Sequence, residues 1–461
     1  MSPTLFLFRT PTRFLAILLL AAASPHLPAV AADKEPPKKE ISDEMSGELS
    51  KMKEKVDAKD YAGAAKLLDG ILAKADRETY DTALASQLKV QILLMDGKYE
   101  KAIPSLLLAN QLGEKYGFYE KKTLLDQLYL LCQIHYQIAA EAKQPERQAE
   151  YYTKAYGYIR TWLDTNPKPT TEGQLFAASI LYGHGTLIQG KPDLALLRQA
   201  RDAAKQGMYL GLKTPDQLYV LLLASLQQLG DHRGEIDVLE ELVRRQPSNA
   251  LYWQQLAGSY LAMANEATED KEIRRYQLCT ILTMQRAQAN GLMNTPKDCL
   301  NLIGMYFNLE QFGKAGELLA DGIKTNKIEN SRANWELLSL AHQQGGHEDR
   351  AIDSLKQAAD LFPTEGQLDL SIAQMHYGAG RTPDALTHLE RAVTKGNLKK
   401  PGAAYLFLGF TAYELQKFEE AAKWADVATQ QPDVKPDDAK RLKRAALDAL
   451  KERQSIKDSK V

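Results

Sequence analysis

The stretch Gly185–Lys191, GTLIQGK, has the spacing of glycines and lysine that holds nucleotide phosphates in G-x-x-x-x-G-K loops. The next residue in such a loop is a Ser or Thr whose hydroxyl binds magnesium, but here it is Pro192. No strand-like pattern precedes the stretch, and a turn between two helices accounts for both glycines. Nucleotide binding is therefore not predicted.

Two histidines, His342 and His376, lie 34 residues apart and could form a metal-binding pair or a pH-sensitive pair. Both occupy the same position of a repeating pattern, where a packed aromatic ring is expected, so we predict partly buried rings. No H-E-x-x-H, C-x-x-C or G-x-S-x-G motif occurs. The sequence predicts no catalytic residues, no metal, no cofactor and no enzyme; an enzyme of unrecognised type is the remote alternative.

Cysteine is rare, and the chain has only Cys132, Cys279 and Cys299. On neighbouring antiparallel helices Cys279 and Cys299 would lie about 12 Å apart, at ~1.5 Å per residue. A disulfide needs Cα atoms within about 7 Å. We therefore expect three buried thiols.

The elements that must position these residues are helices. Apolar residues recur with helical spacing, and turn signals such as Asp96-Gly97, Gly230-Asp231 and Gly345-Gly346 arrive every 12–20 residues. This pattern predicts an all-α fold. Because no single hairpin can bury its apolar side alone, we expect a right-handed α-solenoid of about ten stacked helical hairpins.

A repeat of 34 residues is clearest in the second half of the chain. In the unit that begins at Arg332, Trp335 is at position 4, Ser339 at 8, Ala351 at 20 and Pro363 at 32. This pattern resembles the tetratricopeptide repeat (TPR). Small residues at positions 8 and 20 would allow the two helices of a hairpin to cross closely. The structural positions are predicted at Trp253, Trp335, Ala351, Ala385, Gly409 and Ala421.

The first residues have the pattern of an export signal. Arg9 and Arg13 precede the apolar run FLAILLLAAA, which is too short to span a bilayer of ~30 Å. We expect a cleaved signal peptide at 1–32, a charged, proline-rich linker at 33–40 and a periplasmic mature chain. With 58 basic and 59 acidic residues, the composition indicates no nucleic-acid binding.

The remaining chain divides by how clearly it repeats. Residues 41–210 predict degenerate TPR-like hairpins, 211–431 a clear TPR array, and 432–461 a capping helix and tail. The predicted capping helix has Leu442, Ala446 and Leu450 on one face and basic residues on the other. We expect that basic face to be solvated; contact with an anionic surface is the alternative.

The resemblance to TPR proteins implies a concave groove lined by positions 2, 5, 9 and 12 of each first helix. These positions are rich in amide and aromatic side chains, which suit the backbone and apolar side chains of an extended ligand. Several could instead pack between neighbouring helices. The predicted groove residues are Gln254, Phe307, Glu336, Gln343, Gln367, Gln374, Tyr377, Phe410 and Tyr413.

A narrower resemblance covers roughly residues 210–430, with the segments LYWQQLAGSYLAM and LERAVTKGNLKKPGAAYLFLGFTAYELQKFEEAAKWA. These resemble exported TPR proteins associated with bacterial TonB-dependent transport. The likeness implies a periplasmic adaptor whose partner is TonB, ExbB or ExbD, or a TonB-dependent transporter. The alternatives are an adaptor of another envelope assembly or export complex, and a homodimer formed through the N-terminal hairpins.

Overall fold

The computed structural model describes residues 38–74, 78–211 and 213–458. All regular elements within these ranges are α-helices, 21 in number, which confirms the predicted all-α class. The predicted signal peptide and most of the linker lie outside the described residues. The chain forms two compact units, residues 1–242 and 243–461. The boundary predicted at 210 rests on repeat clarity, a different criterion, and stays a prediction.

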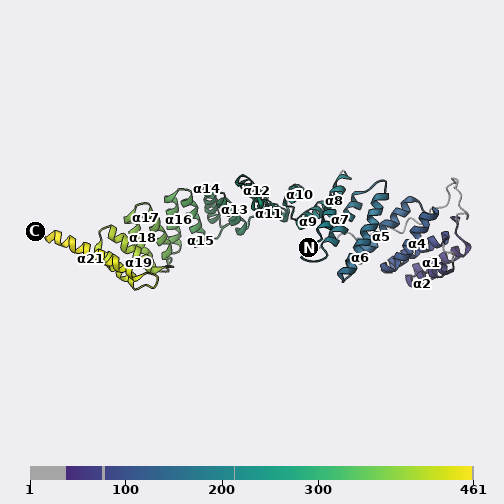
Figure 1. The fold of residues 1–461 in the computed structure, drawn as a ribbon, viewed down its shortest axis with the longest axis horizontal. Helices are drawn as coiled ribbons and strands as arrows, with labels where there is room; N and C mark the ends of the chain where they lie inside the picture. The colour runs from purple at the N-terminus through teal and green to yellow at the C-terminus, as the bar shows by residue number, and fades with distance from the viewer. Residues whose placement is uncertain (1–37, 75–77, 212, 459–461) are drawn as a thin grey trace. The chain divides into compact units, whose positions relative to one another are not determined.

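In the N-terminal unit each helix packs against the next along the chain (Figure 1). Its helices are α1 (Asp43–Asp57), α2 (Tyr61–Lys74), α3 (Tyr80–Met95), α4 (Tyr99–Tyr116), α5 (Lys121–Glu141), α6 (Pro145–Thr165), α7 (Thr171–Gly185), α8 (Leu194–Tyr209) and α9 (Asp216–Leu229). Helix α10 (His232–Arg245) crosses the boundary between the units.

The C-terminal unit repeats the same sequential packing. Its helices are α11 (Ala250–Glu266), α12 (Asp270–Ala289), α13 (Pro296–Asn308), α14 (Phe312–Lys324), α15 (Arg332–Gln344), α16 (Glu348–Leu361), α17 (Gly366–Gly378), α18 (Thr382–Lys395), α19 (Pro401–Glu414), α20 (Phe418–Thr429) and α21 (Pro436–Asp458). The described residues contain twenty helices in sequence, α1–α20, the number that ten hairpins require, and α21 follows them.

Small residues bring the helices of a hairpin together, as the repeat pattern predicts. Ala351, Ala385 and Ala421 are fully buried. The Ser339 hydroxyl of α15 donates to the Ala351 carbonyl of α16 at 2.9 Å. A Cβ on Gly409 would lie 3.3 Å from the Ala421 carbonyl oxygen, so α19 and α20 also cross closely.

The two tryptophans at position 4 of the repeat pattern, Trp253 and Trp335, pack differently. Trp253 is buried, and its indole donates to the Pro247 carbonyl at 2.8 Å. Trp335 is half-buried and donates to the side chain of Asn330 at 2.6 Å. Each indole thus ties the start of its hairpin to the connector before it, because a buried indole N–H needs an acceptor.

In the N-terminal unit, large aromatic rings pack between α5, α6 and α7. Helices α5 and α6 are 21 residues long each. Tyr129 lies 5.3 Å from Trp162 between ring centroids and 5.6 Å from Phe176. Ring packing of this kind needs wider helix spacing than an alanine contact, so the 34-residue pattern fades there.

The cysteine prediction is only partly correct. All three cysteines are thiols in the described structure. Cys132 is buried, but Cys279 and Cys299 are only partly buried. The predicted burial of these two was wrong, because Cys279 and Cys299 lie on partly exposed sides of α12 and α13.

Candidate functional site

The candidate site is the row of side chains at positions 2, 5, 9 and 12 of the first helix of each hairpin in the C-terminal unit. Those helices are α11, α13, α15, α17 and α19, and we call this surface the helix-A face. Neighbouring first helices contact each other through their side chains. The Ser339 hydroxyl of α15 lies 4.0 Å from the Met375 sulfur of α17, and the rings of Tyr377 and Phe407 join α17 to α19 at 5.1 Å.

Four of the nine predicted groove residues have side chains open to solvent: Gln254, Gln343, Gln374 and Phe410. Phe410 is 46% exposed, which is unusual for a phenylalanine. On the same face Leu261 and Leu340 are 37% and 42% exposed. These side chains are uncharged and available for contact.

Two further predicted residues hold the array together. The Tyr377 hydroxyl donates to Glu414 at 2.6 Å, which links α17 to α19. The side-chain oxygen of Gln367 accepts from the Lys399 backbone N–H at 3.2 Å, which fixes the connector before α19. Both side chains are already engaged within the protein, so their contribution to the face is structural at least in part.

The last three predicted residues are half-buried. Phe307 packs edge-on against Phe312 with ring centroids 5.7 Å apart, and Tyr413 packs against Phe418 at 5.4 Å. Glu336 accepts from Arg332 at 2.9 Å. The only acidic residue among the predicted groove residues is therefore neutralised by an adjacent guanidinium.

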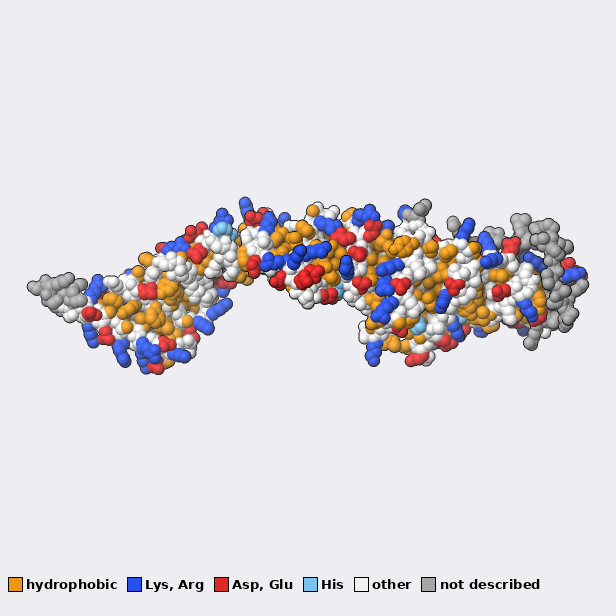
Figure 2. Space-filling model, turned by 45° about the horizontal axis from the view of Figure 1, so that its top comes forward, with side chains coloured by type: hydrophobic (Ala, Val, Ile, Leu, Met, Phe, Trp, Pro, Cys, Tyr) orange, Lys and Arg blue, Asp and Glu red, His pale blue; other side chains and the backbone are white. Residues whose placement is uncertain are grey.

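Hydrophobic side chains reach the surface of the C-terminal unit between charged ones, as the left part of Figure 2 shows. Basic and acidic side chains border the hydrophobic area rather than filling it. On the helix-A face itself, the exposed side chains Gln254, Leu261, Leu340, Gln343, Gln374 and Phe410 are apolar or amides and carry no charge.

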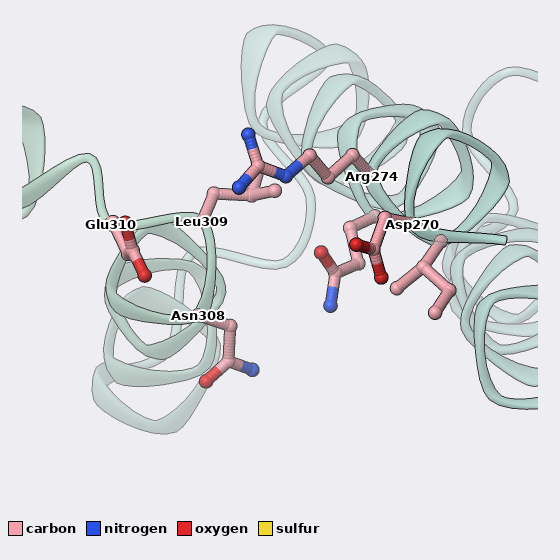
Figure 3. A pocket seen from close by; sticks show the side chains of 7 residues that line it. Asp270, Arg274, Asn308, Leu309 and Glu310 are labelled. Atoms are coloured by element: carbon pink, nitrogen blue, oxygen red, sulfur yellow. The ribbon is translucent and has the colours of Figure 1, made fainter.

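Two hollows of the described structure are lined by none of the predicted groove residues. One, of about 220 Å³, lies between α12 and the turn that follows α13. Figure 3 shows Asp270 and Arg274 on α12, facing Asn308 at the end of α13 and Leu309 and Glu310 in the turn after it. A second, of about 610 Å³, is formed by the α3–α4 and α5–α6 turns of the N-terminal unit. The sequence indicated neither.

No group of acids, histidines and cysteines within the described residues is arranged to bind a metal ion. The phosphate-loop candidate is a hairpin turn: Gly185 ends α7, and Gly190 has φ 77°. His342 is partly buried and its ring lies 3.5 Å from the Cβ position of Gly316, while His376 is 5% exposed. Both histidines pack as the pattern predicted.

The sequence did not predict a buried polar cluster between α17 and α18. Asp369 is 2% exposed and contacts His388 and Lys395. One signal could have revealed it. Asp369 stands at repeat position 4, where Trp335 and Tyr405 stand in neighbouring hairpins, and an acid at an apolar position requires a buried partner.

Comparison with protein families identifies one part of this array. Residues 370–436, from α17 to the start of α21, match the tetratricopeptide repeat family. This segment carries tetratricopeptide repeats. No curated protein sequence matches the chain.

Solved structures resemble parts of the chain. MamA is 17% identical over 38% of this chain and 94% of its own, with a TM-score of 0.27. YrrB, described as a TPR protein with an unusual peptide-binding site, is 13% identical over 47% and 97%, with a TM-score of 0.29. PilF of Pseudomonas aeruginosa is 15% identical over 49% and 90%, with a TM-score of 0.27. Likeness at this level carries no argument about what the present chain binds.

Among the described helices, none combines the length and the apolar character needed to cross a membrane.

Proposed function

We propose that this protein is a non-enzymatic scaffold that binds an extended segment of a partner protein along the helix-A face. One observation carries the proposal. Leu340, Gln374 and Phe410 occupy position 9 of three successive first helices, and all three side chains are exposed. A row of uncharged, exposed side chains repeated once per hairpin is suited to a chain that runs across the helices.

The spacing of the row fits an extended ligand. Helices that touch through their side chains lie about 8–10 Å apart. An extended chain rises about 3.3 Å per residue, so every third residue reaches the next helix. Apolar side chains of the ligand would contact Leu340 and Phe410, and the Gln374 amide would bond to its backbone. The tetratricopeptide repeats of residues 370–436 support this use of the surface.

We further propose that the scaffold works in the periplasm as an adaptor of a TonB–ExbB–ExbD-linked outer-membrane transport system. The export-signal pattern of residues 1–32 supports the location, and the resemblance of residues 210–430 to TonB-associated repeat proteins supports the partner. The ligand that suits this face best is an extended proline-rich segment, because such a segment is low in charge and lacks some backbone N–H donors.

Crosslinking in cells tests both proposals. A photoreactive residue is placed at the exposed Gln343, and the crosslinked proteins are identified by mass spectrometry. The expected products are TonB, ExbB, ExbD or a TonB-dependent transporter. Repeated capture of other envelope proteins would contradict the transport role alone, and no captured protein at all would contradict the scaffold.

Variants then locate the binding surface. The pair Leu340→Ala and Phe410→Ala should reduce crosslinking at least several-fold, because large exposed apolar anchors dominate peptide recognition. Leu361→Ala is the matched control, since Leu361 is 50% exposed on α16 and lies off the helix-A face. If Leu361→Ala reduces crosslinking as much as Leu340→Ala with Phe410→Ala, the proposed surface is ruled out.

A further inference from the structure

A buried cluster of charged and titratable side chains joins α17 to α18. The Asp369 carboxylate of α17 lies 3.0 Å from His388 Nδ1 and 2.7 Å from Lys395 Nζ, both on α18. Asp369 and His388 are 2% and 7% exposed. Breaking a buried pair of this kind is costly, because it leaves a charge without a partner in a low-dielectric interior.

A second histidine extends the cluster along α17. The His376 ring stacks on the His388 ring, with centroids 5.5 Å apart and planes 18° from parallel. His376 Nδ1 is buried and has no hydrogen-bond partner. The other charged groups that face His376 are Lys356 on α16, Arg381 in the turn, and Asp384 on α18.

These surroundings disfavour a charge on His376. Burial lowers the pKa of His376, and the charges of Arg381, Lys356 and a protonated His388 act in the same direction, opposed only by Asp384. A histidine whose folded-state pKa is lowered stabilises the fold fully above its unfolded pKa of about 6.5. That stability is lost as the pH falls through the folded-state pKa.

The carboxylate of the cluster titrates in a different range. Burial opposes the ionisation of Asp369, but hydrogen bonds from His388 and Lys395 outweigh it and lower the pKa of the carboxyl group. Its contribution to stability is therefore present above about pH 4 and is lost only at lower pH. Between neutral pH and about pH 5, the loss of stability therefore comes from His376.

The cluster is mechanically connected to the helix-A face. Helix α17 carries Gln374 and Tyr377 on that face. Lys395, which binds Asp369, is the last residue of α18 and is followed by the connector 396–400. The connector bonds back to α17, with the Gly366 N–H donating to the Gly396 carbonyl at 3.1 Å and the Lys399 N–H donating to Gln367.

We propose that the α17–α18 hairpin is an acid-sensitive joint: protonation of His376, which is buried against the His388 ring, loosens α17 from α18 and so disorders the centre of the helix-A face. In mildly acidic surroundings the scaffold would therefore release its partner. The release rests on the proposed function, whereas the acid-sensitive joint itself does not. A periplasmic location would expose the joint to external acid.

Hydrogen exchange of the mature full-length chain tests the joint without any partner. Amides of residues 366–400 are compared at about pH 7.5 and about pH 5.5, after correction for intrinsic exchange rates. We expect protection there to fall by up to roughly tenfold at the lower pH. Helices α19 and α20 serve as the internal control, because residues 401–429 contain no histidine. Unchanged protection in residues 366–400 would overturn the proposal.

Two variants locate the effect. His376→Tyr keeps a ring at a position where the repeat pattern expects tyrosine but removes titration near neutral pH, so the acid-dependent loss of protection should disappear. His347→Tyr is the matched control, because His347 is exposed, and it should leave the loss intact. His376→Gln is the second variant if the tyrosine perturbs the packing. An acid response that survives both His376 variants would refute the assignment.

The crosslink at Gln343 supplies the functional readout. If the joint controls release, crosslinking falls at about pH 5.5 in the wild type but not in His376→Tyr. If the wild type crosslinks no partner at either pH, the proposed function fails while the exchange result still decides the joint. If crosslinking is equal at both pH values although exchange shows opening, the control of release is refuted.

Discussion

At the scale of single residues, Gly366 shows how little space the closest contacts leave. A Cβ at this position would lie 2.2 Å from the Gly396 carbonyl oxygen and 2.3 Å from that of Ala392. Both are backbone atoms that cannot rotate away. We expect Gly366→Ala to destabilise the C-terminal unit by about 1–3 kcal/mol in urea unfolding.

The matched control for this substitution is Gly304→Ala. Gly304 lies within α13 and has no atom within 4 Å of its Cβ position. Alanine should stabilise that helix by up to about 1 kcal/mol, since it loses less backbone entropy. Destabilisation of similar size at both sites would contradict the steric explanation for Gly366.

The thiols should differ in reactivity. Burial raises the pKa of Cys132 well above its usual value, so the thiol is neutral as well as inaccessible. We expect Cys132 to resist iodoacetamide at about pH 8 until the N-terminal unit unfolds. The partly buried Cys299 should react in the native protein, though slowly, because burial also raises its pKa. Peptide mass spectrometry distinguishes them, and early labelling of Cys132 would contradict the prediction.

The sequence predicted the helix contacts made by small residues better than the contacts made by polar side chains. The repeat register placed Ala351 and Ala385 correctly because each position must be small wherever two helices cross. The same reasoning could not pair Asp369 with His388, since that contact depends on which way a side chain turns within the hairpin. Nor could it show that Tyr377 is bound to Glu414 rather than free to bind a ligand.

At the scale of elements, caps fix where a helix begins. The Thr295 hydroxyl accepts from the Asp298 N–H at 3.2 Å, and the Asp298 carboxylate accepts from the Thr295 N–H at 3.1 Å. This capping box satisfies donors that α13 leaves without partners. Thr295→Ala should cost about 1 kcal/mol of unfolding free energy.

A threonine inside a helix provides the comparison. The exposed Thr394 bonds only to the Glu390 carbonyl within α18, at 2.7 Å. Thr394→Ala should be neutral or slightly stabilising, because that carbonyl already serves the helix. A loss as large as that of Thr295→Ala would show that the effect comes from threonine removal in general.

Turns were predictable where glycine marks them and obscure elsewhere. Gly230 and Gly346 adopt φ 66° and 75°, as the sequence indicated. Glu310 and Gln416 adopt φ 58° and 60° in equivalent turns, although these conformations are unfavourable for residues with a Cβ. The surrounding helices impose these turns, so local sequence alone could not reveal them.

At the scale of the whole molecule, α21 should decide whether the array stays soluble. Ala439, Leu442 and Ala446 are buried against the preceding helices, so removing α21 uncovers an apolar surface. A chain ending at residue 435 should unfold at lower temperature and self-associate in light scattering. A chain ending at residue 455 should match the full length. Equal behaviour of the two would show that α21 is no cap.

In both units each helix packs mainly against its neighbours in the sequence. Contacts of this kind close only short loops, which favours rapid folding. A hairpin has its partners as soon as the following one has been synthesised, and it need not wait for distant residues. Such a chain can acquire its structure progressively from the amino end while it emerges from a ribosome or a translocation pore. Little apolar surface would then be left uncovered at any moment.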